Sequence, residues 1–289
     1  MNSKKLYFLT FLLTSIAFLS AQAAELASAK VLGVTGTATK ITKYGQSAPI
    51  KTGDILKQGD TIQVEELGQV DLVFSNGSEL TVEESSSLKL SKVEQESFPG
   101  NDTYEQLEAD PSVSQTLLEL NYGGLSGHVK KLGEGSKFDI LTPLGTAAIR
   151  GTRFKISLGF DRSSGQLTLQ VTNIDGTVLF TSRYSGAISG GSTVKEYNGG
   201  SDNKTSGIPQ EVTVSVILNT DSQDYETIVN QVLGSLPEGS QIREDLEQAI
   251  EDAEDSKDTE DTSDTATDKE ENEFDDIVII ISDEGPQEL

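Results

Sequence analysis

The sequence predicts an all-β protein: a single winding domain of short strands, like a β-roll or β-helix, with two short C-terminal helices and a disordered acidic tail. Glycine is frequent, at 27 of 289 residues, and only 6% of residues are aromatic. Apolar and polar residues alternate over short stretches between turn-forming residues, which is typical of half-buried strands. The hydrophobic fraction of 35% suits one medium-sized core with appendages.

The N-terminus has the features of a secretory signal peptide. Two lysines precede the apolar run Leu6–Leu19, and Ala21-Gln22-Ala23 provides the small residues that signal peptidase needs. We expect cleavage after Ala23 (signal peptide 1–23) and a periplasmic or secreted mature chain. The run is shorter than the roughly 20 residues that span a bilayer, so we expect no stable membrane insertion. No cysteine is present, which excludes a lipid-anchored cysteine and a disulfide framework.

Glycines punctuate the strands of the first half. Lys30–Ile41 predicts a first strand that bends or bulges at Gly33 or Gly36. Asn76-Gly77 lies between alternating segments and predicts a hairpin. We expect a polar insertion at about 94–114, and we expect Gly123-Gly124 to turn the strand that follows it.

Two Gly-Asp pairs stand six residues apart, Gly53-Asp54 and Gly59-Asp60. One interpretation is a calcium site, because hard cations take carboxylate oxygens. We favour the other, in which each aspartate accepts bonds from backbone amides of its own turn, since no denser Asp-x-Asp run accompanies the pairs.

The most specific stretch is Ser136–Leu158. Alternating apolar residues predict a strand at each end of it. Pro143 pushes Thr142 into an extended conformation, while Gly145 and Gly151 allow backbone angles closed to other residues. We therefore predict a turn region between the two strands.

This stretch and two upstream motifs, 53–62 and 70–78, resemble the FecR domain family in the right order. The resemblance covers about Leu32 to Phe180 and implies an all-β exported domain, as found in regulators of siderophore uptake and in other exported proteins. The chain departs from the regulators, because we find no sigma-factor-binding segment followed by a transmembrane helix. The central motif comprises Thr142, Pro143, Gly145, Arg150, Gly151, Thr152 and Phe154.

Arg150 and Arg153 have two interpretations. In a turn, an arginine can bond several carbonyl oxygens or a carboxylate and hold neighbouring strands in register. With Lys155, the arginines would instead offer a cationic patch to an anionic partner. We favour the structural role for the whole motif. The one histidine, His128, has no second His or Cys with which to share a metal, and we expect it at a sheet edge or facing solvent.

The rest of the chain predicts strands and then helices. We expect a hairpin over 165–180 that turns at Asn173–Gly176, a turn at Asn198-Gly199, and a last strand near Val212–Val216, which completes a β domain at 24–219. Apolar residues at helical spacing predict a helical hairpin within 220–253. Its helices would be capped by Asp221 and Ser240 and pack on the β body.

The C-terminal end is strongly acidic. From residue 244 onward there are 20 acidic residues against two lysines, a net charge of −18 out of −25. We predict a disordered tail at 254–289, because this composition cannot bury enough apolar surface to fold. The tail acts as a solvated spacer or binds calcium weakly. Its apolar segment, Phe274 and Ile277–Ile281, is expected to dock on its own sheet edge or on another protein.

These features restrict the function. The negative charge opposes binding to nucleic acid and to anionic lipid. The sequence has no recognised catalytic motif and no cofactor or metal motif. We predict a non-enzymatic binding or scaffolding module of the cell envelope whose partner is an envelope protein or a cell-surface polymer. One alternative is an accessory periplasmic sensor that contacts an outer-membrane receptor or an anti-sigma regulator, and a third is a carboxylate-dependent hydrolase.

Overall fold

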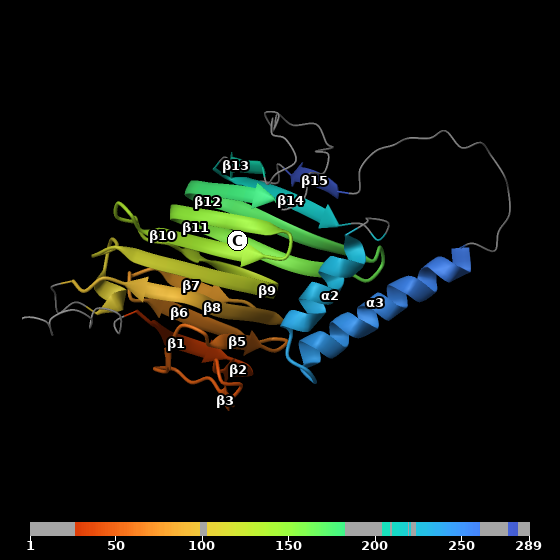
Figure 1. Cartoon of the computed structure of the whole chain (residues 1–289), viewed down its shortest axis with the longest axis horizontal. Coiled ribbons are helices and arrows are strands. Elements are labelled where there is room, and N and C mark those ends of the chain that lie inside the picture. The colour runs from red at the N-terminus through yellow and green to blue at the C-terminus, as the bar shows by residue number, and fades with distance from the viewer. Residues whose placement is uncertain are drawn as a thin grey trace, which may run out of the picture.

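The computed structural model describes residues 27–98, 103–182, 204–208, 210–218, 220, 224–260 and 277–282. Strands dominate, and two helices follow them towards the C-terminus, so the β-rich class is confirmed. The strands run side by side along the long axis, and α2 and α3 lie towards one end (Figure 1). The predicted signal peptide and the turn at Asn198-Gly199 lie outside the described residues.

The described strands belong to one sheet. In chain order they are β1 Ala29–Thr35, β2 Ala38–Ile41, β3 Ser47–Pro49, β4 Ile55–Leu56, β5 Thr61–Val64, β6 Gln69–Phe74, β7 Glu79–Val82, β8 Ser86–Gln95, β9 Ser114–His128, β10 Lys137–Thr142, β11 Gly145–Asp161, β12 Gln166–Ser182, β13 Lys204–Ile208, β14 Val212–Leu218 and β15 Ile277–Ser282. The helical elements are η1 Tyr104–Gln106, α2 Tyr225–Ser235 and α3 Gln241–Glu260.

The sheet branches at β9. The first part of β9 pairs with β8, and the ladder continues through β5 and β2 to β3. The last part of β9 pairs with β7, and the ladder continues through β6 and β1 to β4. On its other side β9 pairs with β10 and β11, and β12 and β14 follow.

Both branches share one hydrophobic core. The ring of Phe74 in β6 meets that of Phe138 in β10 edge to face, with centroids 5.8 Å apart at 73°. Phe154 and Ile156 of β11 are fully buried as well. Each such side chain contributes roughly 1.5–3 kcal/mol on burial, so burial holds the branches together without disulfides.

Some of the bulges and turns predicted at glycines are confirmed, and others are wrong. The first strand does bulge, between Val31 and Gly33, and Asn76-Gly77 does turn a hairpin. The predicted strand Lys30–Ile41 is too long, because β1 ends at Thr35 before Gly36 and β2 begins at Ala38. However, β9 continues through Gly123-Gly124, and β12 continues through Asn173–Gly176, so both of these predicted turns are wrong. A glycine with positive φ serves a bulge inside a strand as well as a turn, and only the neighbouring strands decide between them.

The helices pack on the β body. Their predicted packing stripes are buried, with Ile228 and Val232 in α2 and Ile242 and Leu246 in α3. The Tyr225 hydroxyl donates to the Gly165 carbonyl at 2.7 Å, tying α2 to the β11–β12 hairpin. The predicted cap Asp221 is outside the described residues, and α2 begins after Asp224.

The structure extends order into the predicted acidic tail. The backbone of α3 runs on to Glu260, so the predicted helix end at residue 253 is wrong. At the far end of the tail, β15 pairs antiparallel with β14. Of the two predicted destinations for this apolar segment, it occupies the chain's own sheet edge. No helix of the described residues is long and apolar enough to span a membrane.

Candidate functional site

Arg150, Gly151 and Thr152 of the central motif form a bulge inside β11 rather than a turn. The register of β11 against β12 shifts between Arg150 and Phe154. Gly151 has φ +63°, and a Cβ there would stand 3.2 Å from the Cα of Lys131. In β12, Gly176 has φ +76°, and a Cβ there would collide with the Gly151 carbonyl oxygen. Two glycines therefore allow three chain segments to meet here, and the prediction of Arg150 in a turn is wrong.

Thr152 ties these segments together. Its hydroxyl donates to the Thr177 carbonyl at 2.8 Å and accepts the Thr177 N–H at 2.9 Å. Its own N–H and carbonyl both bond to Val129, at 2.9 Å each. Thr152 and Phe154 are fully buried, so no solvent reaches this hydroxyl.

The motif arginine and its neighbouring cations have separate partners. Arg150 is exposed and donates to the Ser136 carbonyl at 3.3 Å. Asp175 accepts both the N–H and the Nε–H of Arg153, each at 2.7 Å. These bonds, the backbone one foremost, hold the pKa of Asp175 below its usual value.

The remaining residues of the central motif lie where β10 joins β11. Thr142 and Gly145 face each other across the two-residue turn Pro143-Leu144. The Thr142 hydroxyl accepts the Gly145 N–H at 3.0 Å and donates to the Gly145 carbonyl at 2.9 Å. The turn between the two strands is thus confined to Pro143 and Leu144.

The Gly-Asp pairs form two equivalent turns. Gly53 and Gly59 have φ of +90° and +92°. Asp54 Oδ2 accepts the Lys51 N–H at 3.0 Å, and Asp60 Oδ2 accepts the Lys57 N–H at 2.9 Å. These turns flank β4, at the end of the ladder remote from β11. The motif residues therefore form separate groups and not one site.

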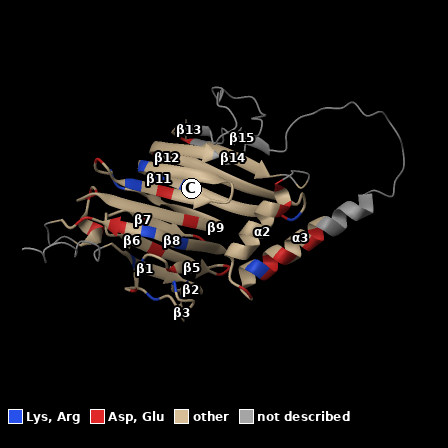
Figure 2. Ribbon diagram, in the orientation of Figure 1, with Lys and Arg blue, Asp and Glu red and all other residues tan. Residues whose placement is uncertain are grey.

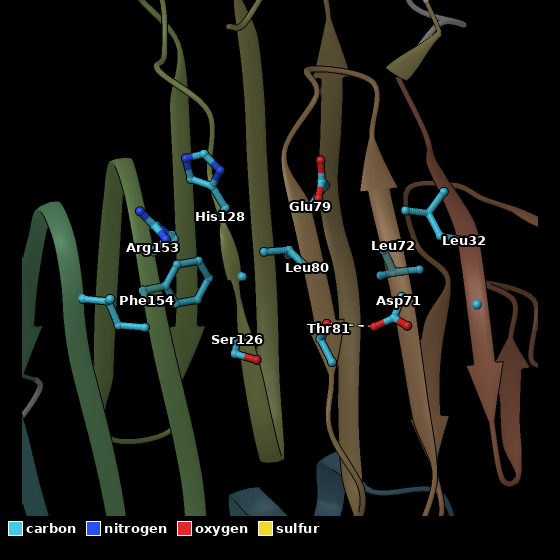
Figure 3. Close-up of a pocket in the computed structure, with 13 residues that line it drawn as sticks. Leu32, Asp71, Leu72, Glu79, Leu80, Thr81, Ser126, His128, Arg153 and Phe154 are labelled. Carbon is cyan, nitrogen blue, oxygen red and sulfur yellow. Dashed lines mark hydrogen bonds between the residues drawn. The ribbon is translucent and has the colours of Figure 1, made fainter. Parts of the chain in front are cut away.

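A groove of about 530 Å³ crosses β1, β6, β7, β9 and β11 and reaches β12 (Figure 3). Buried Leu72, Leu80 and Phe154 contribute to its lining. Leu32 and Ile174 are 37% and 45% exposed. The other lining residues are Gly33, Asp71, Glu79, Thr81, Ser126, Gly127, His128 and Arg153.

Strand register arranges the polar residues of the groove in two rows. Successive register partners on adjacent strands stand side by side on one face. The acidic members lie on β6 and β7, and the basic ones on β9 and β11. Figure 2 shows the same mixture of charges over the sheet. The first row is Glu79, His128 and Arg153, and the second is Asp71, Thr81 and Ser126. Lys155 of β11, the register partner of Ser126, continues the second row beyond the residues that line the groove.

Most charges of these rows are already paired. Glu79 Oε1 lies 3.5 Å from Lys130 Nζ. Lys155 reaches across β9, and its Nζ lies 3.3 Å from Glu83 Oε1. Asp71 accepts a bond from the Thr81 hydroxyl at 2.8 Å (Figure 3). The groove therefore offers hydrogen-bonding and apolar surface of mixed charge rather than a field of one sign.

For His128, the sequence predicts a position at a sheet edge or a side chain that faces solvent. His128 is half-buried on β9, paired with Glu79 of β7 on one side and Arg153 of β11 on the other. The expected position at a sheet edge is wrong, whereas the alternative of a side chain towards solvent agrees with the place of His128 in the lining of the groove. No local signal gives this placement, because both neighbours come from distant parts of the chain.

Among the described residues, no group of three or more His, Asp or Glu side chains could hold a metal ion. Burial raises the pKa of Glu65 and of Asp139, but neither carboxyl lines the groove.

The fold and groove define a class: a β-sheet module with an open groove across its strands. A family model described as FecR protein matches residues 60–179, which confirms the resemblance to the FecR domain family. The match includes the central motif and Asp60 and leaves out Gly53, Asp54 and Gly59.

Other comparisons add little. Two crystal structures of a candidate anti-sigma factor from Parabacteroides distasonis align with TM-scores of 0.34 at 13% and 12% identity. Each alignment covers 56% of this chain and 55% of the other, so the chain spans about half the length of those proteins. This likeness is too weak to establish a shared fold or function. No curated protein matches the chain.

Proposed function

We propose that the chain is an exported, non-enzymatic binding module of the cell envelope that contacts an envelope protein or a surface polymer through the groove. The observation that carries this proposal is the open, mixed-charge groove with exposed Leu32 and Ile174. Exposed apolar side chains beside paired charges are typical of interaction surfaces.

The remaining sequence expectations belong to the same proposal. Export rests on the N-terminal residues, with cleavage after Ala23 as the expected processing step. We propose a winding β-roll at 24–219, the helical hairpin as a covering element, and an acidic spacer beyond it. The branching of the sheet at β9 supports the winding architecture. N-terminal sequencing of the chain recovered from fractionated cells tests both export and the cleavage site.

A second candidate is an accessory periplasmic sensor that contacts an outer-membrane receptor or an anti-sigma regulator. The match of residues 60–179 to the FecR model favours it. The two candidates differ in the partner, since the sensor requires a receptor or a regulator.

Affinity capture with matched variants tests the proposal. Ile174 in the groove and Ile55 outside it are both 45% exposed, so Ile174→Asp and Ile55→Asp make the same surface change at different places. We expect the mature chain to retain a partner from an envelope extract, Ile174→Asp to lose it and Ile55→Asp to keep it. If both variants retained the partner equally, the groove would not be the contact surface. Recovery of glycan supports a scaffold, whereas recovery of a receptor or regulator supports the sensor.

A further inference from the structure

The edge of β14 is closed by a strand that arrives from the end of the chain. β14 pairs with β12 on one side and with β15 on the other. The register runs antiparallel from Thr213 opposite Ser282 to Leu218 opposite Ile277. Figure 1 shows β15 beside β14 at the margin of the sheet. Without β15, no other strand of the described residues would pair with that edge of β14.

In the described residues, a single strand ladder attaches β15 to the body. Of the strands that the structure describes, β14 alone pairs with it. Its sequence, Ile-Val-Ile-Ile-Ile-Ser, consists almost wholly of β-branched residues, whereas the connecting residues 261–276 are rich in Asp, Glu and Thr. A strand held by one ladder at the end of such a connection can leave without unfolding the core.

We propose that the β14 edge is a strand-binding site whose occupant is the chain's own terminal segment, held in cis and exchangeable with the same segment of a second copy. β15 shows what the site takes: an antiparallel, isoleucine-rich strand. An open edge is a template for pairing, and every copy of the chain carries a matching strand. The cis strand normally wins, because tethering gives it an effective concentration on the order of millimolar.

Proline substitution in the full mature chain tests the site through the backbone. Ile279→Pro/Ile280→Pro removes two consecutive amide donors from β15. Thr262→Pro/Ser263→Pro makes the same change in the connection and serves as control. In the β15 variant alone, we expect hydrogen exchange to accelerate at least about 10-fold at every second amide of β14 (Val212–Leu218), those directed towards β15, whereas the amides directed towards β12 stay protected.

The same variants measure binding in trans. A labelled peptide with the sequence of residues 274–283 should bind the β15 variant at least about 10-fold more tightly than the wild type or the control, because the competitor in cis is gone. Unchanged exchange in β14 would overturn the proposal. Faster exchange without saturable peptide binding would overturn it too, since the edge would then not be a binding site.

If circular dichroism shows that the proline variant does not fold, a disulfide cross-link tests instead whether β15 pairs with β14 of its own chain. Ile217 and Val278 are register partners, and the chain has no cysteine to compete. Ile217→Cys/Val278→Cys should form an intramolecular disulfide on oxidation and then bind less peptide than its reduced form. Absence of this disulfide, or disulfides between copies alone, would overturn the placement in cis. The groove variants are independent of these outcomes, so the two proposals fail separately.

Discussion

At the scale of single residues, two features hold the FecR-like motif in place: glycines that leave room for close backbone contacts, and one buried hydroxyl. Gly151 and Gly176 let β11 and β12 approach closely. The Thr152 hydroxyl bonds both the carbonyl and the N–H of Thr177. The bulge at Arg150–Phe154 therefore sets the register of β11 against β12. The groove lies next to this bulge.

Thr152→Val tests the buried hydroxyl. Valine has a similar shape but leaves the Thr177 N–H and carbonyl without their partner, which costs about 1–3 kcal/mol of unfolding free energy. Thr152→Ser keeps the hydroxyl and should lose less. Chemical denaturation followed by circular dichroism measures both, and equal stability of the valine variant and the wild type would contradict the assigned role.

Gly176→Ala tests the close approach. Alanine at φ +76° is strained and collides with Gly151, so we expect a loss of at least about 2 kcal/mol. Gly159→Ala in the paired strand is the control, because a Cβ there meets nothing within 4 Å. Thermal unfolding should separate the two variants, and a similar midpoint for both would show that β12 can shift to admit a methyl group.

At the scale of elements, α3 docks beside a partly buried acid. Burial first, and the charge of Asp245 in α3 second, raise the pKa of Glu65. One oxygen of the Glu65 carboxyl is buried without a hydrogen-bond partner. A raised pKa in the folded state means that the protonated form is favoured on folding. Its contribution to stability is therefore present below the unfolded pKa and is lost as pH rises through the folded pKa.

Asp245→Asn should consequently stabilise the chain at pH 7 and flatten its stability between pH 4.5 and 7. The effect should stay below about 1 kcal/mol, because solvent screens the pair. Asp252→Asn is a close control, since Asp245 and Asp252 each accept a bond from a glutamine four residues earlier at 2.9 Å. Denaturation at several pH values is the measurement, and identical pH profiles for the two variants would exclude the coupling to Glu65.

At the scale of the whole molecule, charge is the dominant long-range term. The chain carries 47 acidic against 22 basic residues, and the ion pairs of the outer face are largely exposed. Exposed pairs contribute little, whereas a net charge of −25 repels itself in any compact state.

Added salt should therefore stabilise the fold. Raising NaCl from about 0.01 to 0.1 M shortens the screening length from about 30 to 10 Å, which weakens the repulsion between distant acids. We expect the thermal midpoint to rise over this range by scanning calorimetry. A fall would mean that the salt bridges of the outer face outweigh the repulsion.

The sequence by itself determined the β-rich class, the bulge in the first strand, the hairpin at Asn76-Gly77 and the packing stripes of both helices. These features follow from local periodicity and from the conformational preferences of glycine and asparagine, which act within a few residues. Composition alone predicts that the terminal apolar segment docks as a strand.

Tertiary structure alone decided the rest. Whether Gly123, Gly151 and Gly176 turn the chain or bulge a strand depends on which strands lie beside them. The groove depends on register, since His128 meets Glu79 and Arg153 only when β9 pairs with both β7 and β11. Pairing between distant segments is set by the shared core, and no short stretch of sequence contains that information.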